Sequence, residues 1–275
     1  MNAETARTLP IGVFDSGVGG LTVLKAIRDT LPGEDLLYLG DTARLPYGTK
    51  SPASISRYAC QATRHLQEQG IKLLVVACNT ASAVALDALR EQMSPLPVIG
   101  VVDPGATAAV TAVAGGKHLV LATEATVRLG AYTRAITARD RAAKVSELAC
   151  EMLVALAEEG WTDGDIATAI VRRYLDQLDG DRSAADCVIL GCTHFPLLRN
   201  AIAAALEPGT TIVDSASTTA SAAAGMLAEL GIANEQSSAG RLNLLATDGA
   251  TRFARVGGRF LGEDLDAADI TLVDL

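Results

Sequence analysis

The chain has few aromatic residues, an excess of acidic over basic side chains and only three histidines. Aromatic residues make up 4% of the 275 positions, so the cores must be built from Ala, Val, Leu and Ile, for which an apolar fraction of 49% is ample. The net charge of −9 argues against a nucleic-acid partner, because Lys and Arg make most phosphate contacts. A small anionic substrate is compatible with it, since a few backbone N–H groups can hold a carboxylate.

Long apolar runs are also missing. No stretch approaches the ~20 uninterrupted apolar residues that span a bilayer, and the best candidate, residues 101–122, is broken by Asp103, Pro104, paired glycines and Lys117. The first ten residues, MNAETARTLP, have no apolar run after their first charges and do not resemble a secretory signal. We therefore expect a soluble cytoplasmic protein without a membrane partner.

The five cysteines form neither a disulfide framework nor a metal motif. Their number is odd, their spacing is irregular and no C-x-x-C pair occurs, which argues against disulfides, zinc and redox sites. A free cysteine usually behaves as a small buried hydrophobe. Cys60, Cys150 and Cys187 are interpreted in this way.

Short apolar runs alternate with helix-like segments along the chain. The runs lie at 11–14, 36–39, 73–77, 97–102, 118–122, 187–191, 211–214 and 242–246. Continuous Val, Ile and Leu without polar alternation are typical of parallel strands covered on both faces. Helical periodicity predicts helices over 20–31, 51–69, 81–93, 146–159, 164–178, 197–206 and 216–230. This alternation predicts an α/β fold with a largely parallel sheet.

Two cysteines stand at the ends of apolar runs. LLVVACNTAS (73–82) ends its run on Cys78, and CVILGCTHFP (187–196) ends its run on Cys192, about one domain length later. Sheets of this type bind ligands just beyond the carboxyl ends of their strands, and helix N-termini at such turns favour a thiolate. If each cysteine ends the equivalent strand of its own domain, two facing domains bring both thiols into one cleft. The pattern alone leaves a catalytic pair and two packing residues equally open.

Other polar residues at strand ends extend this candidate site. His194, two positions after Cys192, is a candidate general acid or base, because the unperturbed pKa of histidine is ~6.5. GVFDSGVGGLT (12–22) fits neither glycine spacing of nucleotide-binding loops. It predicts a tight turn that either exposes Asp15 or uses it as a helix cap. Tyr47 lies in a loop, where it either lines a pocket or packs.

Five stretches, in this order, resemble the glutamate racemases of the cofactor-independent aspartate/glutamate racemase superfamily. They are GVFDSGVGGLTVL, LGDTARLPYGTKS, LLVVACNTASAVALD, VIGVVDPG and LGCTHFPLL. The resemblance is collinear from about residue 11 to about residue 260, and the five motifs together are highly specific. It implies two similar α/β domains, each with a largely parallel sheet flanked by helices, and an active site in the cleft between them. It also implies that neither pyridoxal phosphate nor a metal is used.

The resemblance further implies a two-base mechanism. Cys78 and Cys192 match the two catalytic cysteines, with Cys78 acting on D-glutamate and Cys192 on L-glutamate, and Asp15 and His194 match the residues that assist the thiols. Glu158 matches an auxiliary carboxylate near the histidine. The positions that match substrate-holding residues are Asp15, Ser16, Tyr47, Gly48, Asn79, Thr80, Thr123, Thr126, Thr193 and His194. The product D-glutamate would supply peptidoglycan synthesis, and with it cell-wall biogenesis and cell shape.

The family's chain order predicts a first domain of residues 1–102 plus 211–275 and a second domain of residues 103–210. Two crossings between the domains would form a hinge for a cleft that opens to substrate. A homodimer is the commonest oligomer, although the sequence fixes no arrangement for one. Two departures from the family pattern lie outside the cysteine motifs: Ala122 replaces the glycine that usually precedes Thr123, and CEMLVALAEEG (150–160) lacks the usual prolines.

Two alternatives remain open from the sequence. Aspartate or another acidic amino acid could be the substrate, because the fold and the two cysteines are shared within the superfamily. A protein of a different class, a two-domain small-molecule binder, would use Asp15 and the threonines only to grip its ligand. Unchanged ligand affinity in C78S and C192S variants, without α-proton exchange by the wild type, would favour the binder.

Overall fold

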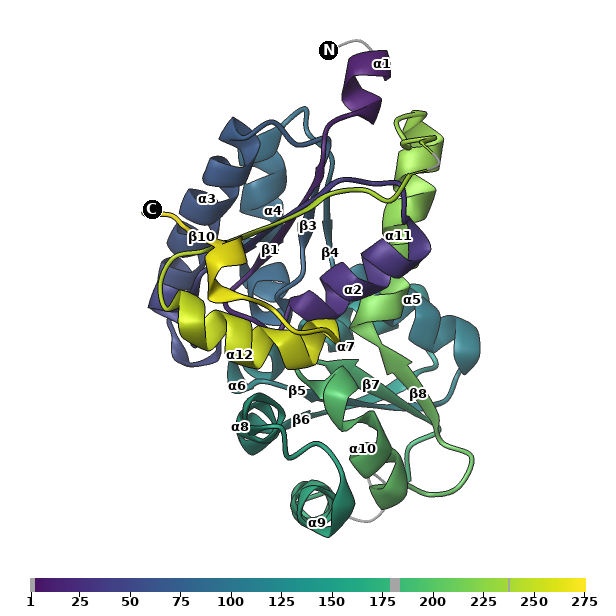
Figure 1. The fold of residues 1–275 in the computed structure, drawn as a ribbon. Coiled ribbons are helices and arrows are strands. Elements are labelled where there is room, and N and C mark those ends of the chain that lie inside the picture. The colour runs from purple at the N-terminus through teal and green to yellow at the C-terminus, as the bar shows by residue number, and fades with distance from the viewer. Residues whose placement is uncertain (1–2, 179–183, 237) are drawn as a thin grey trace.

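The computed structural model describes residues 3–178, 184–236 and 238–275, which form two α/β units (Figure 1). The first unit has a six-stranded sheet in the order β10 (Ile270–Leu272), β9 (Leu242–Ala246), β2 (Leu36–Gly40), β1 (Ile11–Asp15), β3 (Leu73–Val76) and β4 (Val98–Gly100). The second has a four-stranded sheet in the order β6 (Lys144–Ala149), β5 (Lys117–Ala122), β7 (Cys187–Gly191) and β8 (Thr211–Asp214). All neighbouring strands pair in parallel, so the predicted fold class is confirmed.

The strand registers bring the polar strand ends together. Asp15 at the end of β1 is in register with Gly40 at the end of β2. In the second sheet, Ala122 of β5 is in register with Gly191 of β7. The chain therefore leaves neighbouring strands at one edge of each sheet, which is where ligands of such sheets bind.

Helices cover both faces of each sheet. Successive strand residues point to opposite faces, so Val13 packs in one core cluster and Phe14 in another. The first sheet is covered by α3 (Pro52–Glu68) and α4 (Asn79–Met93) on one face and by α2 (Leu21–Thr30), α11 (Ser215–Leu230) and α12 (Ala250–Leu261) on the other. The second is covered by α5 (Val102–Ala112) and α7 (Ala131–Arg139) on one face and by α8 (Glu151–Glu159), α9 (Gly164–Leu175) and α10 (Arg199–Ala205) on the other.

Some predicted boundaries are wrong. The helix predicted over 146–159 begins only at Glu151, because residues 144–149 form β6. β6 and β10 have partly exposed side chains, so they lack the continuous apolar run by which the other strands, including the edge strands β4 and β8, were found. The predicted strand 97–102 is shorter, and Val102 begins α5. Helices that were not predicted are α1 (Ala3–Arg7), α5, α6 (Glu124–Leu129), α7 and α12. Within the described part of the chain, no helix is both long and apolar enough to cross a membrane.

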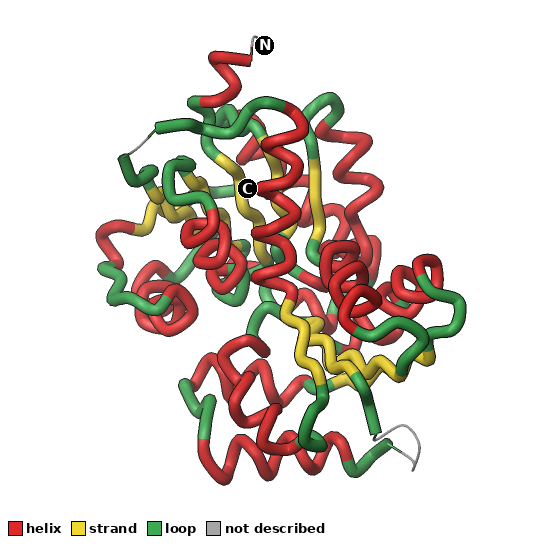
Figure 2. The backbone as a smooth tube through the Cα atoms, turned by 90° about the vertical axis from the view of Figure 1, so that its right-hand side faces the viewer, coloured by secondary structure: helices red, strands yellow, loops and turns green. Residues whose placement is uncertain are grey.

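The chain passes between the two units twice, and Figure 2 shows their strands as two separate groups. It leaves the first sheet after β4 and returns after β8. Because β8 pairs with β7, the return lies between Asp214 and Ser215, and the predicted boundary before Thr211 is placed too early. With that shift, the division into a discontinuous first domain and an inserted second domain remains our proposal.

Candidate active site

Cys78 lies between the end of β3 and the first residue of α4. Its thiol donates to the Ser16 hydroxyl, from the loop after β1, at 3.4 Å, and its sulfur accepts from the Ala81 N–H at 3.4 Å. Burial and, next, the negative charge of Asp15 raise the pKa of Cys78 to about 12. The sequence predicted that the helix N-terminus would favour a thiolate here. Burial outweighs that effect, so Cys78 is a neutral thiol at neutral pH.

Cys192 directly follows β7, and His194 lies beside it. The Cys192 sulfur is 3.8 Å from Nδ1 of His194, whose Nε2 is 3.2 Å from Oε1 of Glu158 in α8. Burial alone would lower the pKa of His194, but its contacts with Cys192 and Glu158 outweigh burial and raise that pKa to about 10. The ring is therefore a cation at neutral pH, and it places a positive charge beside the Cys192 sulfur.

Both cysteines line one narrow cavity of about 70 Å³ between the two units. The predicted residues that line it are Ser16, Tyr47, Gly48, Cys78, Asn79, Thr80, Thr123, Glu158, Cys192, Thr193 and His194. Asp15 and Thr126 lie behind this lining. Lining residues that the sequence reasoning missed are Gly17, Val18, Leu45, Pro46, Glu151 and Val154. The predicted residues are thus gathered at one place, while their roles remain predictions.

Asp15, the last residue of β1, is 1% exposed. One carboxylate oxygen accepts the Gly17 N–H at 2.8 Å, and the other has no hydrogen-bond partner among the described residues. Burial raises the pKa of Asp15, although the charge of His194 and nearby N–H groups oppose the shift. The bond to Gly17 is a turn within the loop, so Asp15 does not cap α2.

Three threonines from both units meet at one side of the cavity. Thr80 of α4 lies 3.0 Å from Thr123, and Thr123 lies 3.1 Å from Thr126, measured between their hydroxyl oxygens. Thr126 is fully buried and supports the other two from α6. Each hydroxyl can donate or accept a hydrogen bond, so these threonines can donate to a carboxylate bound in the cavity.

Asn79, the first residue of α4, is held from the opposite unit. The hydroxyl of Tyr132, in α7, donates to Oδ1 of Asn79 at 2.7 Å. The Asn79 amide nitrogen is then left buried without a hydrogen-bond partner among the described residues. A buried donor without a partner costs free energy unless a ligand satisfies it. Tyr132 could not be predicted from the sequence, because it reaches Asn79 only through the contact between the units.

Tyr47 both packs and lines the cavity. It is 1% exposed, and its ring lies 6.3 Å from that of Phe14 between centroids. Its hydroxyl donates to the buried carboxylate of Asp41 at 2.5 Å, and that carboxylate also binds Arg44 and Thr247. These contacts hold the loop in place. Gly48, in the same loop, packs closely against Thr123 of the second unit.

Gly19 permits the two units to approach at the site. A Cβ atom placed on Gly19 would lie 2.5 Å from Nδ1 of His194 and would overlap the Thr193 hydroxyl. Thr22, in the next turn, donates its hydroxyl to the Thr193 carbonyl at 2.9 Å. The glycine-rich stretch after β1 is therefore explained by this close contact, and nucleotide binding is not needed to explain it.

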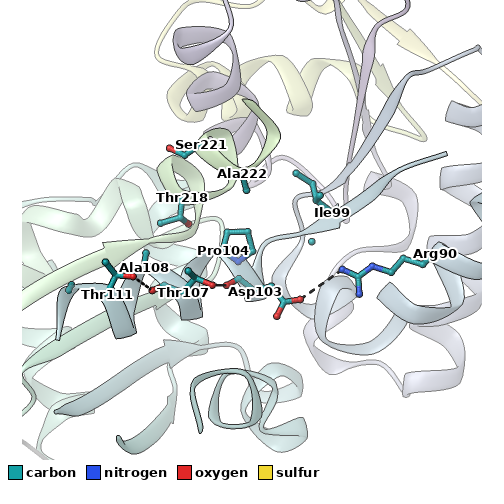
Figure 3. A pocket seen from close by; sticks show the side chains of 12 residues that line it. Arg90, Ile99, Asp103, Pro104, Thr107, Ala108, Thr111, Thr218, Ser221 and Ala222 are labelled. Carbon is teal, nitrogen blue, oxygen red and sulfur yellow. Dashed lines mark hydrogen bonds and ion pairs between the residues drawn. The ribbon is translucent and has the colours of Figure 1, made fainter. Parts of the chain in front are cut away.

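A larger hollow, of about 710 Å³, lies at the two crossings between the units (Figure 3). Asp103 on its wall is already paired with Arg139 and Arg90. The hydroxyls of Thr107 and Thr218 each donate a hydrogen bond to the backbone carbonyl four residues earlier in the chain. Its wall is otherwise mainly apolar and holds neither thiol, so size alone does not identify the active site.

Two parallel α/β units whose polar strand ends face one cavity define a two-domain α/β enzyme. Among the described residues, no group of three or more His, Cys, Asp or Glu side chains could hold a metal ion. The sequence profile described as Asp/Glu/Hydantoin racemase matches residues 11–223. The chain belongs to this racemase family.

Individual relatives agree with this assignment. Glutamate racemase from Geobacter metallireducens is 46% identical over 255 residues, which is 93% of each chain. The crystal structure of glutamate racemase from Thermus thermophilus in complex with β-chloro-D-alanine is 43% identical, with a TM-score of 0.87 over 98% of each chain. The glutamate racemase of Francisella tularensis, in complex with D-glutamate, is 33% identical, with a TM-score of 0.88 over 98% of each chain.

Proposed function

We propose that this chain interconverts L- and D-glutamate with two thiols and no cofactor. One observation carries the proposal: Cys78 and Cys192 come from different units and line the same cavity. Inverting a stereocentre without turning the substrate over requires one proton carrier on each side of the α-carbon. Two facing thiols supply this, whereas two packing cysteines would have no reason to share a cavity with so many polar groups.

The protonation states support one starting direction. His194 places a cation beside the Cys192 sulfur, which suits Cys192 to act as the base, while burial keeps Cys78 as a thiol. The Cys192 thiolate takes the α-proton of L-glutamate and becomes a thiol, leaving a carbanion at the α-carbon. The Cys78 thiol then gives its proton to the opposite face, which yields D-glutamate and a Cys78 thiolate. The reverse sequence starts from that form and restores the first.

The carbanion requires strong stabilisation, because an α-proton next to a carboxylate is a very weak acid. The free amide nitrogen of Asn79 and the N-terminus of α4 are suited to hold the α-carboxylate as it gains negative charge. Thr80 and Thr123 offer hydroxyl donors beside them. Asp15 lies behind the cavity lining, so we assign it to the Cys78 side of the site and not to direct contact with the substrate. The product D-glutamate would enter peptidoglycan synthesis.

The test is to incubate the enzyme with L-glutamate in deuterated water. Two thiols predict that D-glutamate carries α-deuterium from its first appearance, while L-glutamate recovered early remains protiated. C78A and C192A should each abolish racemisation, whereas C60A, which changes a cysteine of α3 outside the cavity, should leave it unchanged. Deuterium appearing equally early in recovered L-glutamate would contradict a separate base on each face.

Aspartate or another acidic amino acid is the second candidate substrate. The family description names both Asp and Glu, and the two-thiol chemistry acts on an α-carbon common to all amino acids. The same deuterium experiment with L-aspartate separates the two. A higher kcat/KM for aspartate than for glutamate would replace the substrate in our proposal and leave its mechanism intact.

A further inference from the structure

A chain of contacts leads from the Cys192 sulfur to the opposite unit. Glu158 of α8 uses one carboxylate oxygen for Nε2 of His194, at 3.2 Å, and the other for Nη2 of Arg252, at 2.5 Å. Arg252 belongs to α12, which packs on the first sheet. The last link of this chain is therefore made across the boundary between the units.

The side chains of His194 and Glu158 are largely buried, whereas that of Arg252 is exposed. Their exposed fractions are 13%, 19% and 53%, respectively. Isolated ion pairs on the surface are weak. The pair of Arg252 and Glu158 differs from these because the other oxygen of the Glu158 carboxylate is bound to His194. By holding one oxygen, Arg252 fixes the direction in which the other oxygen points.

α12 touches the histidine at a second point. The ring of Phe260 meets the His194 ring edge-on, with 5.0 Å between centroids. The charged and titratable groups that face His194 are Cys192 from its own loop, Glu158 from α8 and Asp15 from the end of β1. Within the described contacts, Arg252 is the side chain of α12 that pairs with a carboxylate of this set.

We propose that Arg252 is a positioning residue that aims the Glu158 carboxylate at His194 and so completes the Cys192 side of the site only when α12 lies against α8. This inference rests on the proposed two-thiol function. Without Arg252, the Glu158 carboxylate is free to turn toward water, and His194 loses the partner of its Nε2 atom. The imidazolium beside the Cys192 sulfur is then less favoured.

The chain provides a matched control on the same helix. Arg259 donates from Nη1 to the backbone carbonyl of Glu158 at 2.5 Å, so it contacts the same residue without touching its carboxylate. R252M and R259M remove the same charge and leave side chains of similar length. A difference between the two variants therefore measures the effect of losing the contact with the Glu158 carboxylate. Net charge and the general packing of α12 change in the same way in both.

The first readout needs no activity. The chain has three histidines, so the ring signals can be followed by NMR titration of the substrate-free enzyme, with H194Q assigning the His194 signal. In the wild type, His194 should titrate at about 10. We expect R252M to lower that pKa by about one unit, R259M to leave it unchanged and R252K to lie between. A titration of R252M that coincides with that of R259M would overturn the proposal.

The second readout is racemisation. A one-unit drop in the pKa of His194 lowers the protonated fraction about tenfold at pH above both values. In R252M, the decrease of kcat/KM at alkaline pH should therefore begin at a lower pH. The change should be equal for both enantiomers, because the equilibrium constant between them is unity. An alkaline decrease of kcat/KM at the same pH in R252M and the wild type would overturn the inference. If the wild type did not racemise glutamate, the proposed function would fail, while the NMR titration would still test the contact.

Discussion

The hydroxyl of Tyr132 in α7 donates a 2.7 Å hydrogen bond to Oδ1 of Asn79 in α4, and this bond joins the second unit to the first beside the cavity. It fixes which end of the Asn79 amide is free. Oδ1 is occupied, so the NH₂ group, which is buried without a described partner, is the end left for a ligand. The orientation of a substrate-binding group in one unit is therefore set by the other.

Replacing Tyr132 by Phe should raise KM for glutamate up to about tenfold, because one hydrogen bond contributes roughly 0.5–1.5 kcal/mol. The phenyl ring keeps the packing, so the midpoint of thermal unfolding should change little. Steady-state kinetics of Y132F, N79A and the double variant test the coupling. Fully additive losses in the double variant would show that Tyr132 does not act through Asn79.

Replacing Gly19 by Ala should reduce kcat/KM about 100-fold, the cost of displacing reacting groups by about 1 Å. The added methyl group would lie 2.5 Å from Nδ1 of His194, so the histidine or the loop must move. Gly225, inside α11, has open space around it and provides the control. G225A should keep full activity and raise stability by roughly 0.5–1 kcal/mol, because alanine favours helix more than glycine. Equal activity in both variants would contradict the close contact.

Neutralising Asp15 should make Cys78 more reactive. The charge of Asp15 raises the pKa of Cys78, so D15N lowers that pKa and increases the thiolate fraction at a given pH. Iodoacetamide labelling followed by mass spectrometry, at pH 8 to 10 without substrate, measures the rate at each cysteine. Cys192 should be labelled before Cys78 in the wild type, and D15N should narrow the difference. Slower labelling of Cys78 in D15N would contradict the assignment.

Stability should fall as the pH rises above neutrality. The folded-state pKa of His194, about 10, lies above its ordinary value of 6.5. Its contribution to stability is therefore fully present below about pH 6.5 and is lost as the pH rises through about 10. Urea unfolding of the wild type should show this loss between pH 7 and 10. H194Q should show a flatter dependence, and an identical slope in both would refute the link.

The buried ion pair between Lys72 and Glu34 should matter for stability and little for activity. Their charged atoms lie 2.5 Å apart, and the two side chains are 0% and 2% exposed. K72M leaves the Glu34 carboxylate buried without its cation, at a cost of about 3–5 kcal/mol. The double variant K72M/E34Q removes both charges and should lose less. Urea unfolding compares them, and a loss in K72M no larger than in the double variant would contradict the expectation.

The sequence was most informative where a strand is buried on both faces. Cys78 and Cys192 were located because each follows a continuous apolar run, and the structure places both at strand ends beside one cavity. β6 was missed because polar residues interrupt its apolar ones, and β10 because only the first of its three residues is buried. An apolar run reveals a strand only where the strand is buried, and both of these strands are partly exposed.

Residues that act through contacts between the units could not be predicted. Tyr132 and Arg252 lie in helices that the sequence did not even predict, and nothing in their local pattern points to Asn79 or Glu158. Glu151 reaches the cavity only because its helix begins where β6 ends. Such roles follow from the relative placement of distant segments, which no local pattern in one sequence encodes.

The order of strands in the first sheet has a consequence for synthesis on the ribosome. β1 to β4 emerge first, but β9, which pairs with β2, and β10, which pairs with β9, are the last strands to be made. The second sheet, β5 to β8, emerges whole in between, so it can be complete while the first still has an unpaired edge. α12 also emerges late, and Arg252 with it. A nascent chain therefore holds both cysteines long before it holds the helix that braces His194.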